Sequence, residues 1–100
     1  LLYLMTALNN ISEDEGTMLD NTGIILTSEI YRGNTHSHMN QNFLVAGGCG
    51  GALKMNQFIN YDGDKPHNDL LVSMLQAYGI EADTFGDEES CTGPLTELMA

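Results

Sequence analysis

Two short apolar runs, residues 23–26 and 43–46, frame the central part of the chain. Each contains β-branched Ile or Val and is bounded by Gly, Thr or Asn, so each predicts a strand. Neither run alternates between apolar and polar positions. This indicates strands that are covered on both faces, as in a parallel sheet flanked by helices. We therefore expect an α/β fold with a mostly parallel sheet, whose ligands lie in the loops beyond the carboxyl ends of the strands.

Two other segments, residues 1–12 and 68–78, show the spacing of helices that bury one face. The apolar positions of the first are Leu1, Leu4, Met5, Leu8 and Ile11. Those of the second are Leu70, Leu71, Met74, Leu75 and Tyr78. Gly16 and Gly79 suit the two carboxyl ends, and Asp64 or Asn68 suits the start of the second helix. A further short strand is expected near residues 58–61.

Glycine occupies four of the five positions from 47 to 51. Neither GxGxxG nor GxxxxGK[ST] is present, so this stretch predicts a tight structural turn and not a phosphate cradle. The acidic stretch at 62–69 lacks the spacing of a calcium-binding loop and predicts a solvated turn before a helix. The tail after residue 79 is acidic and turn-rich. We expect it to lie against the body through Ile80, Phe85, Leu95 and Leu98.

Composition limits the partners of the chain. Three Lys and Arg residues stand against 14 Asp and Glu, which gives a formal net charge of -11. Such a charge repels nucleic acid and anionic membranes, so neither is an expected partner. No apolar stretch approaches the roughly 20 residues of a membrane span. Cys49 and Cys91 lack CxxC spacing, and the sequence leaves open one disulfide or two free thiols.

Two or three short strands leave sheet edges and a sheet face uncovered, and an isolated pair is marginally stable. The chain also enters an apolar helical pattern at Leu1, with no capping residue before it. We therefore expect residues 1–100 to be the C-terminal part of a single larger α/β domain. Its first partner would be the upstream remainder of that domain.

The loop between the two predicted strands contains the densest group of side chains that could bind a metal or a substrate. His36 and His38 stand at i and i+2, so an extended backbone would direct both rings to one side. Glu29 follows the first strand as a third ligand, or as a carboxylate that fixes a histidine tautomer. Three such ligands suit a divalent transition ion, zinc above all, that activates water or polarises a phosphate or sulfate ester. Glu29, His36 and His38 are therefore the predicted metal ligands.

The same loop carries further polar side chains that would orient these ligands or bind substrate. They are Ser28, Arg32, Asn34 and Asn40. Neither Ser28 nor Ser37 lies in the GxSxG turn that exposes a nucleophilic serine, so a Ser-His-Asp hydrolase is not favoured.

Seven motifs occur in order along the chain: EGTMLDNT at 15–22, TSE at 27–29, GNTHSHMN at 33–40, LVAGGCGG at 44–51, HNDLLVSMLQAYG at 67–79, FGD at 85–87 and CTGPL at 91–95. Together they resemble the carboxyl-terminal end of the DUF1552 or HXXSHH family of bacterial exported proteins. That family is similar to DUF1501 proteins and, more distantly, to the alkaline phosphatase and sulfatase superfamily. The resemblance implies an alkaline-phosphatase-like fold and export to the periplasm or the cell exterior.

In that superfamily a buried strand ends in a Ser-Asp-His or Ser-Asp-Asn ligand motif, and another histidine ligand follows in the next loop. By similarity, Ser28 and Glu29 fall on the first motif, and His36 or His38 on the second. Glu replaces Asp at position 29, and Ile30 replaces the adjacent ligand. The nucleophile and the remaining ligands would lie upstream of Leu1.

The resemblance implies a metal-dependent hydrolase that acts on a small phosphate or sulfate ester, with this segment alone not expected to be active. The alternative is a non-catalytic exported binding or structural protein that kept the fold, lost the metal site and recognises a protein partner. The isoleucine at position 30, which cannot bind a metal, is the reason for the alternative.

Overall fold

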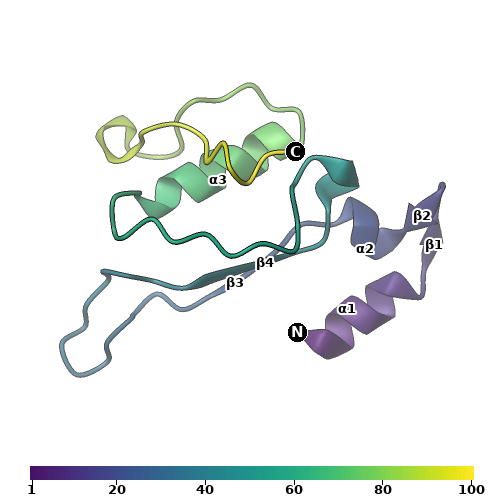
Figure 1. Ribbon diagram of the computed structural model, residues 1–100, viewed down its shortest axis with the longest axis horizontal. Helices are drawn as coiled ribbons and strands as arrows, with labels where there is room; N and C mark the ends of the chain where they lie inside the picture. Colours follow the sequence, from purple (N-terminus) through teal and green to yellow (C-terminus); the bar gives the residue numbers. More distant parts are fainter.

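The computed structural model describes all 100 residues as a mixed α/β chain with two small antiparallel sheets. Figure 1 shows the longest helix lying over a long hairpin, with a smaller helix and turn beside it. The elements in chain order are α1 (Leu2–Asn9), β1 (Ser12–Glu13), β2 (Gly16–Thr17), α2 (Met18–Asn21), β3 (Ile24–Thr27), β4 (Phe43–Ala46), the 3₁₀ turn η1 (Cys49–Gly51), α3 (His67–Ala77) and the 3₁₀ turn η2 (Glu88–Ser90).

The central strands β3 and β4 form where the sequence predicts them, but they pair antiparallel. The expectation that they belong to a parallel pair is wrong. A parallel pair needs a crossover connection, usually a helix, whereas residues 28–42 form an irregular loop that returns the chain directly beside β3. The structure confirms a mixture of helices and strands, but both of its sheets are antiparallel, and no parallel sheet is present within these residues.

The register of the hairpin explains why apolar and polar residues do not alternate along its two strands. Ile25 lies opposite Val45 on the face that packs against the core. Leu26 lies opposite Leu44 on the other face, where the two side chains are 51% and 47% exposed. Both faces are thus apolar, as the sequence indicates, but only one is covered.

The amino-terminal region is organised around a short turn that the sequence did not reveal. β1 and β2 form a two-residue ladder, and α2 follows with a capping box between Thr17 and Asp20. The helix predicted for residues 1–12 is present as α1, but it ends before Asn10 and so does not extend to Gly16. The predicted buried face of this helix is wrong, because no residue of α1 is buried.

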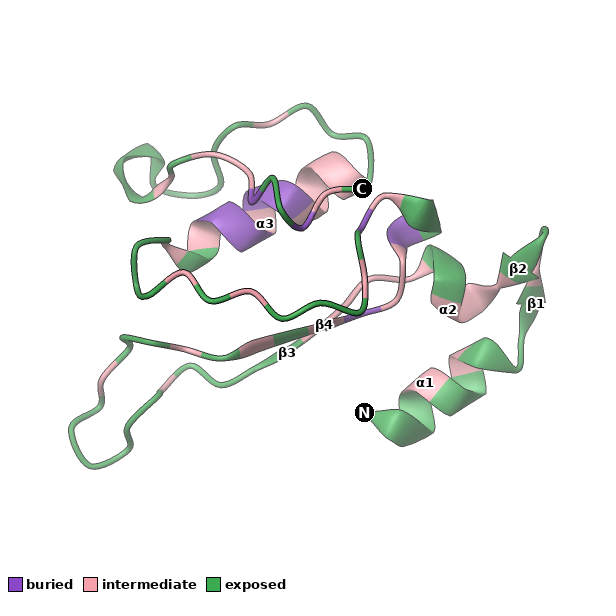
Figure 2. Ribbon diagram, viewed as in Figure 1, coloured by how far each residue is buried: buried purple, intermediate pink, exposed green.

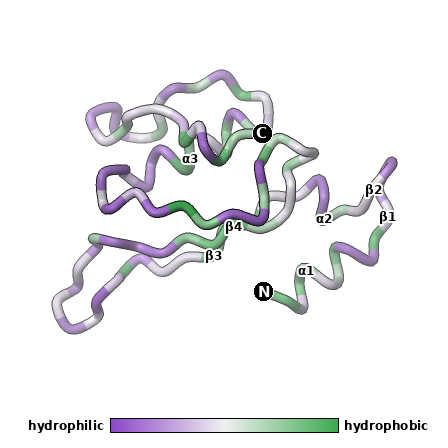
Figure 3. Tube along the Cα trace, viewed as in Figure 1, coloured by the Kyte–Doolittle hydropathy of each residue, from purple (hydrophilic) through white to green (hydrophobic).

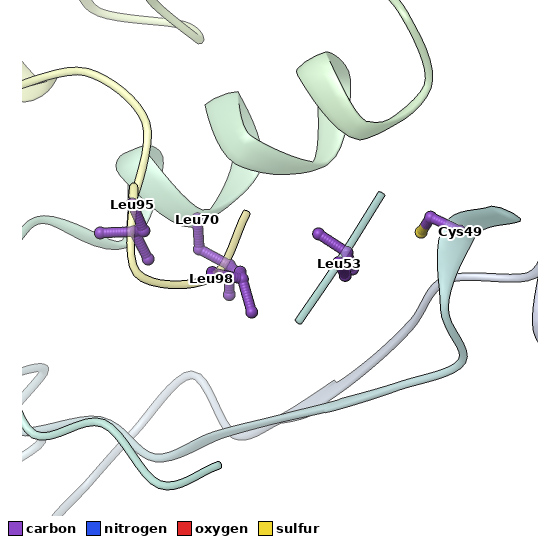
Figure 4. Close-up of a cluster of buried hydrophobic side chains, with 5 residues drawn as sticks. All are labelled: Cys49, Leu53, Leu70, Leu95 and Leu98. Atoms are coloured by element: carbon purple, nitrogen blue, oxygen red, sulfur yellow. The ribbon is translucent and has the colours of Figure 1, made fainter. Parts of the chain in front are cut away.

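The core lies between α3, η1 and the last residues of the chain (Figure 4). Its contiguous cluster of buried apolar side chains is Cys49, Leu53, Leu70, Leu95 and Leu98, and Ala46 and Val72 are also buried. Figure 2 shows this concentration, with buried segments mainly on α3 and around η1, while the hairpin loop and α1 are mostly exposed. Two of the predicted tail anchors, Leu95 and Leu98, are confirmed, but Ile80 and Phe85 remain largely exposed.

Helix α3 agrees closely with the predicted helix at 68–78, and Gly79 ends it at a φ of 78°. The predicted caps are wrong. Pro66 occupies the cap position without a side-chain hydrogen bond, and Asn68 donates to the carbonyl oxygen of Phe85. The strand expected near residues 58–61 does not form, since these residues pair with no other strand.

The glycine-rich stretch is a tight structural turn, as predicted. Gly47 adopts a φ of 80°, and a Cβ at this position would collide with the carbonyl oxygen of Thr22. The backbone N–H of Cys49 donates to that same carbonyl at 3.3 Å. The turn therefore holds the end of β4 against the segment that leads into β3. Both cysteines are free thiols.

Candidate functional site

The loop of residues 28–42 joins β3 to β4 and carries every predicted site residue. It projects from the paired strands as a long, mostly polar excursion (Figures 1 and 3). The seven predicted side chains are all exposed, namely Ser28, Glu29, Arg32, Asn34, His36, His38 and Asn40. The loop is therefore accessible to a ligand along its whole length.

The two arms of this loop are joined through the backbone of Glu29. Its carbonyl oxygen lies 2.7 Å from Nδ1 of His38 and also accepts a hydrogen bond from Nε2 of Gln41. A carbonyl oxygen can only accept, so Nδ1 of His38 must carry a proton. In the neutral ring, the lone pair then lies on Nε2, which has no hydrogen-bond partner in the chain. Gln41, which the sequence reading missed, helps to fix this arrangement.

A turn at the tip of the loop separates the two histidines. Tyr31 donates its backbone N–H to Ser37 at 2.9 Å, and Ser37 donates back to Arg32 at 3.2 Å. His36 lies within the enclosed turn and adopts a φ of 51°. The segment is therefore not extended, and the argument that places both rings on one side does not hold.

The predicted metal ligands do not form a ready-made site in this arrangement. No group of three or more His, Cys, Asp and Glu side chains lies close enough to hold a metal ion. Glu29 meets His38 through its carbonyl and not through its carboxylate. The donor types suit a transition metal, but residues 1–100 alone do not gather enough of them.

The predicted supporting residues make no side-chain hydrogen bond to the histidines either. Ser28 turns back on its own backbone, where its hydroxyl donates to the carbonyl of Ile30 at 3.1 Å. Arg32, Asn34 and Asn40 make no side-chain hydrogen bond to His36 or His38. Asn40 instead faces the turn at Gly63, where its Oδ1 would lie 3.5 Å from an added Cβ.

A groove runs beside the second arm of the loop. It encloses about 1020 Å³ between residues 38–45 on one side and residues 54–67 on the other. His38 lies along one wall, and the rings of Phe43 and His67 stack with centroids 6.5 Å apart. The sequence did not indicate this groove, because the residues of its second wall become neighbours of the loop only through the long coil after η1.

Tyr61 supplies a neutral hydroxyl to this groove. Burial raises the pKa of its phenol, and the nearby carboxylate of Glu97 raises the pKa further. The hydroxyl donates to Oε2 of Glu97 at 3.4 Å. Tyr61 therefore remains protonated across the physiological pH range, and because its proton is directed to Glu97, its oxygen can accept a hydrogen bond in the groove.

Comparisons with protein-family models, with curated proteins and with solved structures found no match for this chain. None of its helices has the length and apolar character that crossing a bilayer requires.

Proposed function

We propose that the chain is the C-terminal part of a larger exported α/β domain of the alkaline-phosphatase-like kind, and that this domain is a metal-dependent hydrolase of phosphate or sulfate esters. The observation that carries the proposal is the hydrogen bonding of the two ring nitrogens of His38. Its Nδ1–H is bound to a backbone carbonyl, which leaves Nε2 free. Histidines that bind metals are typically held in this way, because the second hydrogen bond fixes the tautomer and the ring orientation.

His38 would be the metal ligand that this segment contributes, with Glu29 and His36 as further ligands. The carboxylate of Glu29 makes no hydrogen bond or ion pair, and the ring of His36 is equally unpaired, so both are available. The upstream part of the domain would supply the ligands that complete the set and the nucleophile. A bound zinc or similar ion would polarise the ester and stabilise the negative charge that develops on it.

The proposal of a larger domain is supported by the apolar surface of the hairpin and of α1. Leu26 and Leu44 form an apolar pair on the uncovered face of the sheet, and Leu2 and Tyr3 of α1 are 77% and 89% exposed. Only nine of the 100 residues are buried, which is few for a chain with 42% hydrophobic residues. An antiparallel hairpin is also a common edge of an otherwise mostly parallel sheet.

Elemental analysis of the intact protein tests the metal assignment. We expect about one transition ion per chain, and we expect His38→Ala to remove it because the ring nitrogen that binds the ion is lost. Thr35→Ala is the matched control in the same loop, since Thr35 is exposed and its side chain makes no hydrogen bond. His36→Ala measures the contribution of the second histidine. An unchanged metal content in His38→Ala would refute the ligand assignment.

The non-catalytic alternative is favoured by one specific observation, which is that Glu29, His36 and His38 do not gather into a metal-binding group. A screen of phosphate and sulfate esters with the intact protein separates the two functions. Turnover that disappears with a chelator and returns with zinc establishes the hydrolase. Stoichiometric binding of an exported protein, without metal and without turnover, establishes the alternative.

A further inference from the structure

One stretch of the chain, residues 57–60, has the sequence of a strand but no strand to pair with. Phe58 and Ile59 favour extended backbone, as does Tyr61 directly after them, and no helix or turn interrupts these positions. In the structure no backbone N–H or carbonyl of residues 57–60 makes a hydrogen bond within the chain. We call residues 57–60 the unpaired segment. Unpaired strand edges are templates for pairing with another extended chain.

The side chains along this stretch point alternately toward the body of the molecule and away from it. Gln57 donates its side-chain amide to the carbonyl of Glu97 at 2.9 Å, and the Tyr61 hydroxyl donates to the carboxylate of Glu97 at 3.4 Å. Phe58, one residue after Gln57, is 92% exposed, and Asn60 is exposed as well. Such alternation is typical of extended backbone. Glu97 thus anchors one face of the stretch, and the other face stays open.

The groove beside the unpaired segment offers apolar surface along its length. Phe43 and Val45 line it from β4, and Phe58 and the 66% exposed Met39 line it too. Two continuous stretches of chain, 38–45 and 54–67, border the groove, so an extended ligand can lie along it. Its volume of about 1020 Å³ is at the upper limit of small-molecule sites, which leaves room for several residues of a peptide.

The charges around the unpaired segment favour a basic ligand. Asp62 and Asp64 are exposed and line the groove just after the segment, and the carboxylate of Glu97 lies beside it. Lys65 is already engaged in an ion pair and a hydrogen bond, so Lys54 is the free cation of the groove. The whole chain has a formal net charge of -11. A basic chain is therefore attracted to the groove, and an acidic one is repelled.

We propose that the unpaired segment binds an extended basic peptide, which adds to it as a neighbouring strand within the groove. Backbone hydrogen bonds to residues 57–60 hold the peptide, and its apolar side chains cover the ring of Phe58. Its Lys or Arg side chains lie beside Asp62 and Asp64. Strand addition is a general mode of peptide recognition, in which the backbone gives affinity and side-chain contacts give specificity. The site is independent of the proposed hydrolase, because it needs neither a metal nor an ester.

Amide hydrogen exchange of the intact protein with the peptide acetyl-KVTVKV-amide tests the site. The peptide alternates polar and apolar residues, so as a strand it has one basic and one apolar face. We expect exchange at alternate amides of residues 57–60 to slow about tenfold or more at saturation, because one edge of the segment becomes paired. Calorimetry with acetyl-EVTVEV-amide should show at least about tenfold weaker binding at low ionic strength. Equal affinity for the two peptides overturns the basic specificity.

Methylation of the peptide backbone separates strand pairing from general adhesion. One isomer of acetyl-KVTVKV-amide carries N-methyl groups at its three valines, and the other carries them at its lysines and threonine. Alternate N–H groups of a strand point to opposite edges, so one isomer should lose most of the affinity while the other keeps most of it. The same affinity in both isomers, whether kept or lost, overturns pairing along one edge.

Substitutions in the protein locate the peptide. Phe58→Ala should weaken acetyl-KVTVKV-amide about tenfold, because apolar cover is lost. Asp62→Asn/Asp64→Asn should weaken it about three- to fivefold and reduce its salt dependence. Ile80→Ala and Asp83→Asn are the matched controls, since both positions are exposed and outside the groove, and they should leave affinity nearly unchanged. All these side chains are exposed, so the variants should fold. Unchanged affinity in Phe58→Ala, or unchanged exchange in the unpaired segment, overturns the proposal.

Discussion

Replacing Asp69 with alanine should detach the C-terminal segment from α3. Asp69 is fully buried, at 0% exposure, in the first turn of the helix. Its carboxylate accepts hydrogen bonds from the backbone N–H of Thr92, at 2.7 Å, and from the Thr92 hydroxyl. One turn later the hydroxyl of Ser73 accepts a hydrogen bond from the backbone N–H of Leu95 at 2.7 Å. These bonds hold residues 92–95 against α3 and place Leu95 in the core.

The expected loss of stability follows from the number of groups left unpaired. Each hydrogen bond to a charged acceptor contributes about 1.5 to 3 kcal/mol, and Asp69→Ala removes two of them. The ion pair with Lys65 adds little, because that lysine is 36% exposed and its nitrogen lies 3.8 Å away. Removal of a buried charge returns part of its desolvation cost. We therefore expect a net loss of about 3 kcal/mol, and about 1 to 2 kcal/mol for Ser73→Ala.

Amide hydrogen exchange gives the sharpest measurement, because it reports on Thr92 and Leu95 directly. A loss of about 3 kcal/mol corresponds to roughly hundredfold faster exchange at these amides. Urea unfolding of the same variants gives the global free energy. Asp83→Ala is the control, since Asp83 is exposed and its side chain makes no hydrogen bond, and it should stay within about 0.5 kcal/mol of the parent. Unchanged exchange at both amides in Asp69→Ala would refute the reasoning.

Three further predictions concern the backbone, pH and the sheet. Gly47→Ala should cost about 2 kcal/mol or more in urea unfolding, because the added Cβ collides with a backbone carbonyl at a φ of 80°. Hydrogen bonds, chiefly from the backbone N–H of Thr17, hold the pKa of Asp20 below its ordinary value of 3.8. Because the folded state lowers this pKa, the ionised carboxylate of Asp20 stabilises the turn fully above pH 3.8. The stabilisation is lost as the pH falls through the folded-state pKa. NMR titration of the Asp20 carboxyl measures that pKa. The double variant Leu26→Thr/Leu44→Thr should destabilise the intact protein by about 2 kcal/mol if the proposed domain covers this face, whereas the Leu→Met pair should not.

The elements that the sequence predicted well are those whose pattern is local. Helix α3 carries four of the five predicted apolar positions at helical spacing, the fifth being its C-cap Tyr78, and a glycine follows directly; both signals act within a few residues of one another. β3 and β4 were located to within one residue for the same reason. The direction of pairing is not local. The two apolar runs are separated by a 15-residue irregular loop. Such runs can form an antiparallel hairpin or belong to a parallel pair joined by a crossover, and only the path of the loop decides between them.

The candidate site was also predicted only where its signals are local in the sequence. The loop between the strands was found because its polar residues are contiguous in sequence. The pairing of His38 with the carbonyl of Glu29 was missed, because the prediction assumed an extended backbone and the carboxylate as the contact atom. The backbone of His36 takes a left-handed conformation, which is unusual for a non-glycine residue and carries no sequence signal. The groove was missed because Lys54 and Phe43, which both line it, are brought to the same groove only by the path of the coil after η1.

The uncovered face of the hairpin links the fold to the proposed site. A strand pair with apolar residues on both faces is stable only when both are removed from water, and here α3 and the C-terminal segment cover one face alone. In the proposed larger domain, the element that covers Leu26 and Leu44 would pack directly beneath the strands that carry the loop of residues 28–42. The same packing would fix the two arms of the loop, which are joined near His38 by the Glu29 carbonyl with its two donors and by the backbone bonds of Ser37 to Tyr31 and Arg32. Under the proposed function, the ligands that complete the set around His38 would come from the element that covers this face.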